Sequence, residues 1–318
     1  MKDMTTPHQA LTHMREEIGA GLIGHQILVE RLLIALLAGG HVLIEGPPGI
    51  AKTRAVNHLA AHLPGNDARI QCTPDLLPSD LTGTQVFRPE TGDFDFVAGP
   101  VFHSLVLVDE INRAPPKVQA ALLEAMAERQ VTTGGVTRAL PDPFMVVATQ
   151  NPIEHEGTFP LPEAQLDRFL LHLRLDMPDA TQERAILDLI EAEAMAPLRV
   201  EAFVTPEQLK QARVEIAKVH LAPALKDFIV RLVMATRDGG AVSQWVEHPV
   251  SPRGTLALAG AVRARAWLNG RDHGLPDDAE DLAADALSHR LVPAWQAESE
   301  GRDGRTLVAE ILREVRPW

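Results

Sequence analysis

The pattern of apolar and polar residues divides the chain into short apolar runs and longer stretches with helical periodicity. The apolar runs predict buried strands at residues 41–44, 68–72, 105–108, 144–149 and 169–175. Between these runs, apolar residues recur at the spacing of amphipathic helices, which we expect to end at Gly39-Gly40 and near Leu63, and to cover 116–128 and 162–168. Strands that alternate with helices predict an α/β fold with a parallel sheet.

After Met177-Pro178 only the helical period remains. Helices are predicted at 181–194, 206–219, 222–237, 252–268, 276–291 and 306–315. A chain of 318 residues with 45% hydrophobic residues is long enough for two folded domains and too apolar for general disorder. We therefore expect an α/β domain over residues 1–178 and an all-helical domain over residues 179–318.

Charge and composition exclude several classes of function. The formal net charge is −13 and no dense run of Lys and Arg occurs, which argues against a nucleic-acid-binding surface. The longest apolar run, Leu32 to Ala38, is too short to span a bilayer, and the first seven residues lack the apolar core of a signal peptide. We expect a cytoplasmic protein. Its single cysteine, Cys72, excludes an intrachain disulfide and a thiolate zinc cluster.

The segment from Gly46 to Thr53 has the spacing of a phosphate-binding loop between a strand and a helix. Its glycines let the backbone wrap an anion, and the N–H groups at the start of the helix face the anion's oxygens. Lys52 can reach the outer phosphates, and the Thr53 hydroxyl can ligate Mg²⁺. Ala51 replaces the usual glycine, which requires helical backbone dihedrals there. The predicted nucleotide-binding residues are Gly46, Pro47, Pro48, Gly49, Ile50, Ala51, Lys52 and Thr53.

Polar groups follow two other predicted strands. Asp109 and Glu110 end the strand 105–108, and a nucleotide hydrolase needs one carboxylate to hold Mg²⁺ and another to activate water. We assign Asp109 to the metal and Glu110 to the water, because consecutive strand residues point in different directions. Asn151 follows the strand 144–149, where its amide could hold the attacking water. The alternatives are a solvated pair of acids and an ordinary Asn-Pro turn.

Five motifs in order resemble the AAA+ ATPases of the MoxR family, and with the helical remainder the resemblance covers essentially the whole chain. The motifs are Gly46–Thr53, Thr73–Gly83, Asp109–Pro115, Ala148–Pro152 and Leu161–Phe169. Ala51 agrees with this family, whose loops often have alanine before the lysine. The resemblance implies an AAA+ core with a five-stranded parallel sheet, a C-terminal helical lid, and a homo-hexameric ring that hydrolyses ATP with Mg²⁺ at subunit boundaries.

The resemblance also implies roles for single residues. Lys52, Thr53, Asp109 and Glu110 correspond to the nucleotide, magnesium and acidic positions of the family, and Asn151 to its first sensor.

Arg168 matches the arginine finger that acts on a neighbour's nucleotide; Arg113 competes for this role, and a salt bridge with Asp167 or Glu163 is the structural alternative.

Arg253 lies in the first turn of a helix that Ser251 and Pro252 are expected to start. It corresponds to the family's second sensor. Whether Arg253 would act within its own subunit or across the interface stays open, and an arginine that is merely exposed at a helix start is the alternative.

Two segments have hairpin character, 83–99 and 130–137. They resemble the helix-two insert and the pre-sensor hairpin of the family, elements that contact clients in related rings. Solvated hairpins with packed aromatic residues are an equally good interpretation.

The resemblance implies that the ring acts as a chaperone-like factor that remodels, matures or activates a partner protein complex, often by inserting metal cofactors. It also implies a partner with a von Willebrand factor A domain, which would be a separate polypeptide. Alternatives are a motor of the Rubisco-activase or magnesium-chelatase type, and a nucleotide-gated scaffold with negligible turnover.

Overall fold

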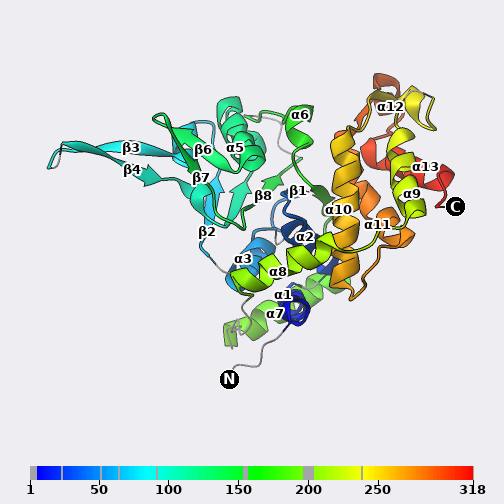
Figure 1. Cartoon of the computed structure of the whole chain (residues 1–318), viewed down its shortest axis with the longest axis horizontal. Coiled ribbons are helices and arrows are strands. Elements are labelled where there is room, and N and C mark those ends of the chain that lie inside the picture. The colour runs from blue at the N-terminus through cyan, green and yellow to red at the C-terminus, as the bar shows by residue number, and fades with distance from the viewer. Residues whose placement is uncertain are drawn as a thin grey trace.

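The computed structural model describes residues 6–22, 24–50, 52–63, 65–90, 92–152, 157–195, 204–237 and 239–317. Figure 1 shows a sheet with long hairpins on one side of the molecule and a helical half on the other side. In the described residues, no helix is both long enough and apolar enough to cross a membrane.

The central sheet has five parallel strands, and all five were predicted from the apolar runs. Its order is β2-β5-β8-β1-β9. The strands are β1 (Val42–Glu45), β2 (Asp67–Gln71), β5 (Leu105–Asp109), β8 (Met145–Gln150) and β9 (Leu171–Arg174). The carboxyl ends of parallel strands meet at one edge, which we call the carboxyl edge; the opposite one is the amino edge.

Helices cover the sheet of the α/β half. They are α1 (Pro7–Ala20), α2 (Gln26–Ala38), α3 (Lys52–His62), α4 (Pro78–Thr82), α5 (Pro116–Glu128) and α6 (Glu163–Leu166), with single 3₁₀ turns η1 (Pro100–Phe102) and η2 (Ile111–Arg113). The chain thus has the predicted α/β fold. Helix α6 is shorter than the predicted 162–168, because Asp167 already caps its end.

The second half consists mainly of the predicted helices. They are α7 (Ala180–Met195), α8 (Pro206–Ala217), α9 (Pro223–Met234), α10 (Pro252–Leu268), α11 (Pro276–Leu287) and α13 (Gly304–Glu314). The short helix α12 (Trp295–Ser299) and the 3₁₀ turn η3 (Ser243–Trp245) were not predicted, and the 3₁₀ turn η4 (Ser288–Arg290) follows α11 within the predicted range 276–291. The prediction of helices alone was wrong in one place, because β10 (Val246–His248) and β11 (Val292–Pro293) pair as a small antiparallel ladder.

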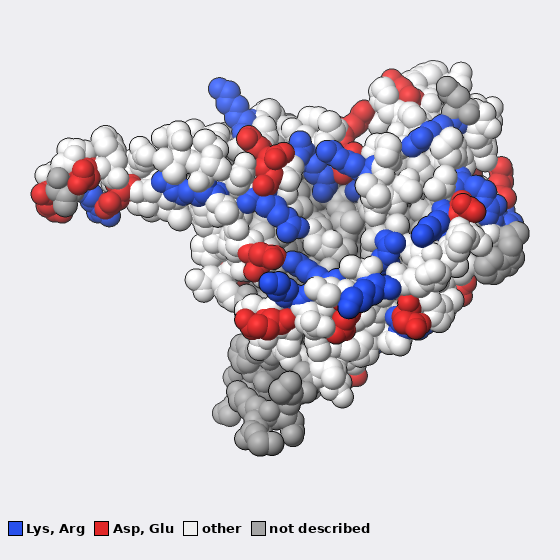
Figure 2. Space-filling view, viewed as in Figure 1, with Lys and Arg blue, Asp and Glu red and all other residues white. Residues whose placement is uncertain are grey.

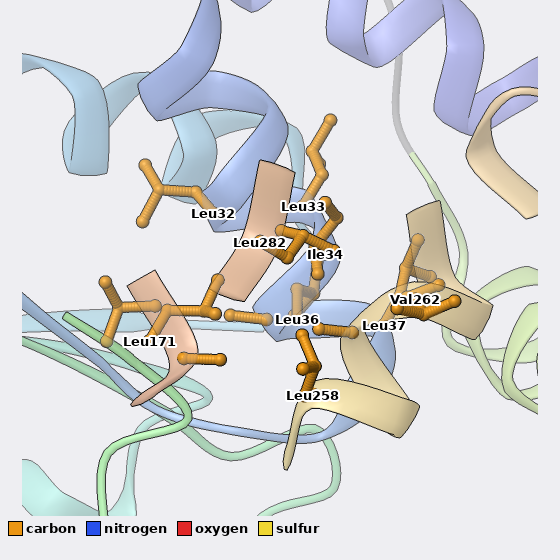
Figure 3. Close-up of a cluster of buried hydrophobic side chains, with 14 of the residues drawn as sticks. Leu32, Leu33, Ile34, Leu36, Leu37, Leu171, Leu258, Val262 and Leu282 are labelled. Carbon is orange, nitrogen blue, oxygen red and sulfur yellow. The ribbon is translucent and has the colours of Figure 1, made fainter. Parts of the chain in front are cut away.

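The apolar core continues from one half into the other. Leucine and isoleucine side chains of α2 pack together with Leu171 of β9, Leu258 of α10 and Leu282 of α11 (Figure 3). The buried Arg31 of α2 reinforces this contact, since it donates to Asp285 (2.9 Å) and Asp281 (2.6 Å) of α11. The helical half is therefore anchored on α2, and the expected boundary at residue 178 stays a prediction.

Both predicted hairpins form. One consists of β3 (Gly83–Arg88) and β4 (Asp93–Ala98), the other of β6 (Gln130–Thr133) and β7 (Val136–Ala139). In Figure 1 the first hairpin projects far from the sheet. Near its tip, Phe87 and Phe94 are 50% and 65% exposed with ring centroids 5.3 Å apart, so an apolar pair faces the solvent there.

Candidate active site

The phosphate-binding loop leaves the carboxyl end of β1 and enters α3. The backbone at Gly46 is tightly enclosed, because a Cβ atom there would lie 2.7 Å from the Leu175 carbonyl oxygen. Gly49 has φ +84°, a conformation that favours glycine. Ile50 is buried and anchors the loop, Pro47 is half-buried, and Pro48 and Gly49 are exposed. Ala51 lies outside the described residues.

Lys52 and Thr53 occupy the first turn of α3, and both are half-buried. The Lys52 Nζ donates to the carbonyl oxygens of Gly46 (2.5 Å) and Gln150 (3.4 Å), so the amine lies over the loop at the carboxyl edge. Partial burial lowers the pKa of Lys52, while the nearby carboxylates of Asp109 and Glu110 oppose this shift. The amine thus lies in the field of both predicted catalytic acids.

Asp109 and Glu110 have different surroundings, as different roles require. The Asp109 carboxylate is 8% exposed and accepts hydrogen bonds from Arg69 Nε (2.7 Å) and Thr149 Oγ1 (3.2 Å). Glu110 has φ 55°, a strained conformation for a residue with a side chain. Its side chain accepts from Gln71 Nε2 (2.9 Å) and Arg113 NH1 (3.3 Å).

Arg69, Gln71 and Thr149 are site residues that sequence reasoning missed. The sequence shows only that Arg69 and Gln71 are two positions apart on one strand and so share a face; it does not show which strand lies beside them. Their strand pairs with β5 and places Gln71 beside Asp109. Thr149 joins the two acids, since its hydroxyl donates to Asp109 and accepts from the Glu110 backbone N–H (3.0 Å).

Asn151 lies at the same edge, directly after β8, and is buried. Asn112 Nδ2 donates to its carbonyl oxygen (3.5 Å), and the neighbouring Gln150 carbonyl accepts from the Gly46 N–H (3.2 Å). The fold therefore brings the phosphate-binding loop, the two acids and Asn151 together at the carboxyl edge.

Arg168 and Arg253 lie elsewhere, at the amino edge of the same sheet. They line a cavity of about 420 Å³ together with Arg129 and Arg290, and this cavity also includes Gly40. Gly40 precedes β1, whereas the phosphate-binding loop follows β1. In Figure 2, Lys and Arg side chains surround a hollow in the middle of the face shown. We call this cavity the arginine pocket.

The structure also separates the two finger candidates. Among the described residues, the Arg168 side chain has no hydrogen-bond or ion-pair partner, so the alternative salt bridge with Asp167 or Glu163 is not formed. Arg113 instead contacts Glu110 at the carboxyl edge of its own chain. Arg253 NH1 lies 3.6 Å from Asp167 Oδ2, and Ser251 caps α10 as expected, accepting from the Arg253 N–H (3.2 Å).

The carboxyl edge fits a magnesium nucleotide. The enclosed Gly46 backbone and the N-terminus of α3 form a cradle for phosphate, and the Thr53 hydroxyl and Asp109 carboxylate are the hard oxygen donors that Mg²⁺ prefers. Among the described residues, no three His, Cys, Asp or Glu side chains gather as a metal cluster. Protein-bound Mg²⁺ in phosphate-transfer sites commonly takes one or two carboxylates and completes its shell with phosphate and water.

Comparison with known proteins agrees with this geometry. The profile of the ATPase family associated with various cellular activities (AAA) matches residues 41–171, and that of the AAA lid domain matches residues 240–311. The chain is 42% identical to chaperone MoxR1 of Mycobacterium tuberculosis, over 94% of this chain and 80% of the relative. It is 31% identical to protein MoxR of Methylorubrum extorquens, over 98% and 95% respectively.

A crystal structure of a Cytophaga hutchinsonii protein assigned as an ATPase has a TM-score of 0.89 and 40% sequence identity, and the match covers 98% of this chain and 95% of that one. The sequence match to MoxR1 extends over nearly the whole chain. The matched AAA region contains four of the five strands of the central sheet, and the matched lid region contains Arg253 and Arg290 of the arginine pocket. This chain therefore belongs to the MoxR family of AAA+ ATPases.

Proposed function

We propose that the protein hydrolyses ATP at sites completed by two neighbouring copies in a ring, a homo-hexamer. One observation carries this proposal: the phosphate-binding loop and the arginine pocket occupy opposite edges of one sheet. A strand of four residues spans roughly 13 Å. A guanidinium at the amino edge is therefore better placed to reach the nucleotide of a neighbouring subunit than the nucleotide bound at the carboxyl edge of the same chain.

Each half of the site has its own task in this proposal. At the carboxyl edge, the loop and Lys52 bind the phosphates of ATP, Thr53 and Asp109 hold Mg²⁺, Glu110 activates water and Asn151 orients it. When bound, Mg²⁺ neutralises charge on the phosphate oxygens. The neighbour supplies Arg168 as the finger and Arg253 as the second sensor, which stabilise the charge that develops on the γ-phosphate.

The ring would use ATP turnover to remodel or activate a partner protein complex in the cytoplasm, with a separate von Willebrand factor A domain protein as adaptor. The exposed pair Phe87 and Phe94 near the hairpin tip supports a protein client, since apolar side chains exposed together favour protein contact. The net charge of −13 disfavours nucleic acid as the client, because nucleic-acid phosphates repel an acidic protein.

Steady-state phosphate release tests the proposed turnover. Glu110→Gln should bind ATP but release phosphate far more slowly than the wild type, because an amide cannot accept the water's proton. Both proteins are compared at concentrations where the ring assembles. If the wild type released no more phosphate than Glu110→Gln, the hydrolase proposal would be abandoned in favour of a nucleotide-gated scaffold.

Mixed rings test the shared site. Arg168→Ala should retain ATP affinity but lose turnover by about 10³-fold, the usual order for a missing arginine finger. Mixing it with Glu110→Gln should restore part of the activity, because Glu110→Gln subunits present an intact Arg168 to the neighbour. Arg184→Ala, which removes an exposed arginine whose ion-pair partner in the described part of the chain is Asp188, is the matched control. Full activity of Arg168→Ala would transfer the finger role to Arg113.

A further inference from the structure

The arginine pocket contains a carboxylate that the proposed function does not use. We propose that Asp167 is a positioning residue, which couples Arg168 of the α/β half to Arg253 of the helical half so that both guanidinium groups are presented to the neighbouring nucleotide as one unit. This inference rests on the proposed function, because it concerns the same shared site.

Asp167 accepts hydrogen bonds from side chains of the helical half. Its carboxylate, 17% exposed, accepts from Arg290 Nε (2.9 Å) and from Ser251 Oγ (3.1 Å), and it forms the 3.6 Å ion pair with Arg253. The backbone of Asp167 is fixed as well, since its N–H closes the last turn of α6. One side chain of the α/β half thus holds the start of α10, from which Arg253 projects.

Arg290 completes the coupling from the other side. It is buried and donates to the carbonyl oxygens of Phe169 (2.6 Å), Leu170 (3.2 Å) and Asp167 (3.3 Å), and also to that of Ala286 in α11. These contacts hold the backbone on both sides of Arg168, at Asp167 and at Phe169. Burial lowers the pKa of Arg290 to about 10, with Asp167 opposing the shift, so Arg290 remains a cation at neutral pH. The buried cation fixes Asp167 and the finger segment together.

The charges of the pocket agree with a positioning role. Four arginines and one carboxylate line it, a net charge of +3, and burial holds the lining His41 neutral with a pKa of about 4. The contact between Asp167 and Arg253 is long, and the Arg253 side chain is 60% exposed, so it is readily exchanged for a phosphate oxygen. Arg290 would still neutralise Asp167 after that exchange, which leaves the carboxylate in place to orient α10.

Asp167→Asn preserves the shape of the side chain but removes its charge. We expect phosphate release to fall by about tenfold or more, while the affinity of the variant's own loop for a fluorescent ATP analogue stays within about twofold of wild type. Rings mixed with Glu110→Gln should regain activity, because those subunits supply correctly held arginines to the Asp167→Asn loops. A variant that was only misfolded would lose nucleotide binding and would not be complemented.

A second variant avoids the buried, uncompensated Arg290 that Asp167→Asn leaves behind. Ser251→Gly removes the hydroxyl that donates to Asp167, and glycine is itself a tolerated N-cap residue, so α10 should still form. We expect kcat to fall about threefold with KM for ATP unchanged, and Ser251→Gly to add nothing in an Arg253→Ala background, since residues acting through one interaction are non-additive.

Asp285→Asn is the matched control. Asp285 is a sheltered carboxylate that pairs with Arg31 and Arg305 outside the pocket, so its loss should lower the melting temperature without changing kcat in folded protein. Wild-type kcat in Asp167→Asn or Ser251→Gly would overturn the inference. So would an Asp167→Asn variant that binds ATP normally but is not complemented by Glu110→Gln. Absence of phosphate release by the wild type in the same assay would instead overturn the proposed function.

Discussion

His41, the residue before β1, shows how one buried side chain ties three elements together. The Val146 N–H of β8 donates to its Nδ1 (3.0 Å), and its Nε2 donates to the Met126 carbonyl of α5 (3.3 Å). Both ring nitrogens are satisfied only if the ring is neutral with its proton on Nε2. Burial lowers the pKa of His41 to about 4. Protonation would therefore break the hydrogen bond from Val146.

This shift makes stability depend on pH. Between the folded pKa of about 4 and the unfolded value of 6.5, the unfolded chain binds more protons, so the free energy of unfolding falls as the pH falls. His41 alone should account for a loss of about 2 kcal/mol between pH 7 and pH 5. The buried His289, whose pKa is also lowered by burial, acts in the same direction.

Urea unfolding of wild type and His41→Asn at the two pH values measures this contribution. The variant should be less stable at pH 7 but should lose about 2 kcal/mol less than wild type on acidification. Equal losses in both proteins would show that His41 titrates normally in the folded state.

The carboxyl-edge residues could be predicted because each follows a strand whose apolar run is visible in the sequence. Gly46, Asp109 and Asn151 needed only the rule that parallel strands end at one edge. Arg69 and Gln71 could not be assigned in the same way, since their role depends on which strand is the neighbour of β2, and strand order is not local information. For the same reason, the contact between Asp167 and Arg290, which are 123 residues apart, could not be predicted from the sequence.

Among whole elements, α5 and α10 begin and end at the predicted residues, 116–128 and 252–268. Both have proline in the first turn, a strong local start signal. Helix α1 was not predicted, although Thr6 and Gln9 form a capping box. Its face is buried by α2 and α8, so tertiary packing stabilises it more than its own pattern does.

Two glycines of α10 should respond oppositely to alanine. Gly260 has open space around its Cα, so Gly260→Ala should raise the free energy of unfolding by about 0.5–1 kcal/mol through helix propensity. At Gly254 a Cβ would overlap the Val250 side chain and also contact Arg290 and Leu287, so Gly254→Ala should be destabilising. Thermal unfolding of the pair measures both effects. A higher melting temperature for Gly254→Ala would mean that the Val250 side chain can move aside without loss of stability.

At the scale of the whole molecule, the continuous core makes the two halves dependent on each other. A fragment of residues 1–178 would expose the face of α2 that packs against α8 and α10, and would leave Arg31 without Asp281 and Asp285. We expect this fragment to aggregate or to bind a hydrophobic dye, whereas the full chain unfolds in one cooperative transition. A soluble fragment with its own cooperative transition would contradict this expectation.

In the proposed ring, the amino edge of each subunit would donate arginines and the carboxyl edge would accept them, so the interface between copies would be heterologous, head to tail. An open row of such subunits always has one acceptor without a donor and one donor without an acceptor, and only closure of the row removes this mismatch. Turnover per subunit should therefore increase with the length of an open row and reach its maximum on closure. In this protein, ring closure would itself be a step of activation.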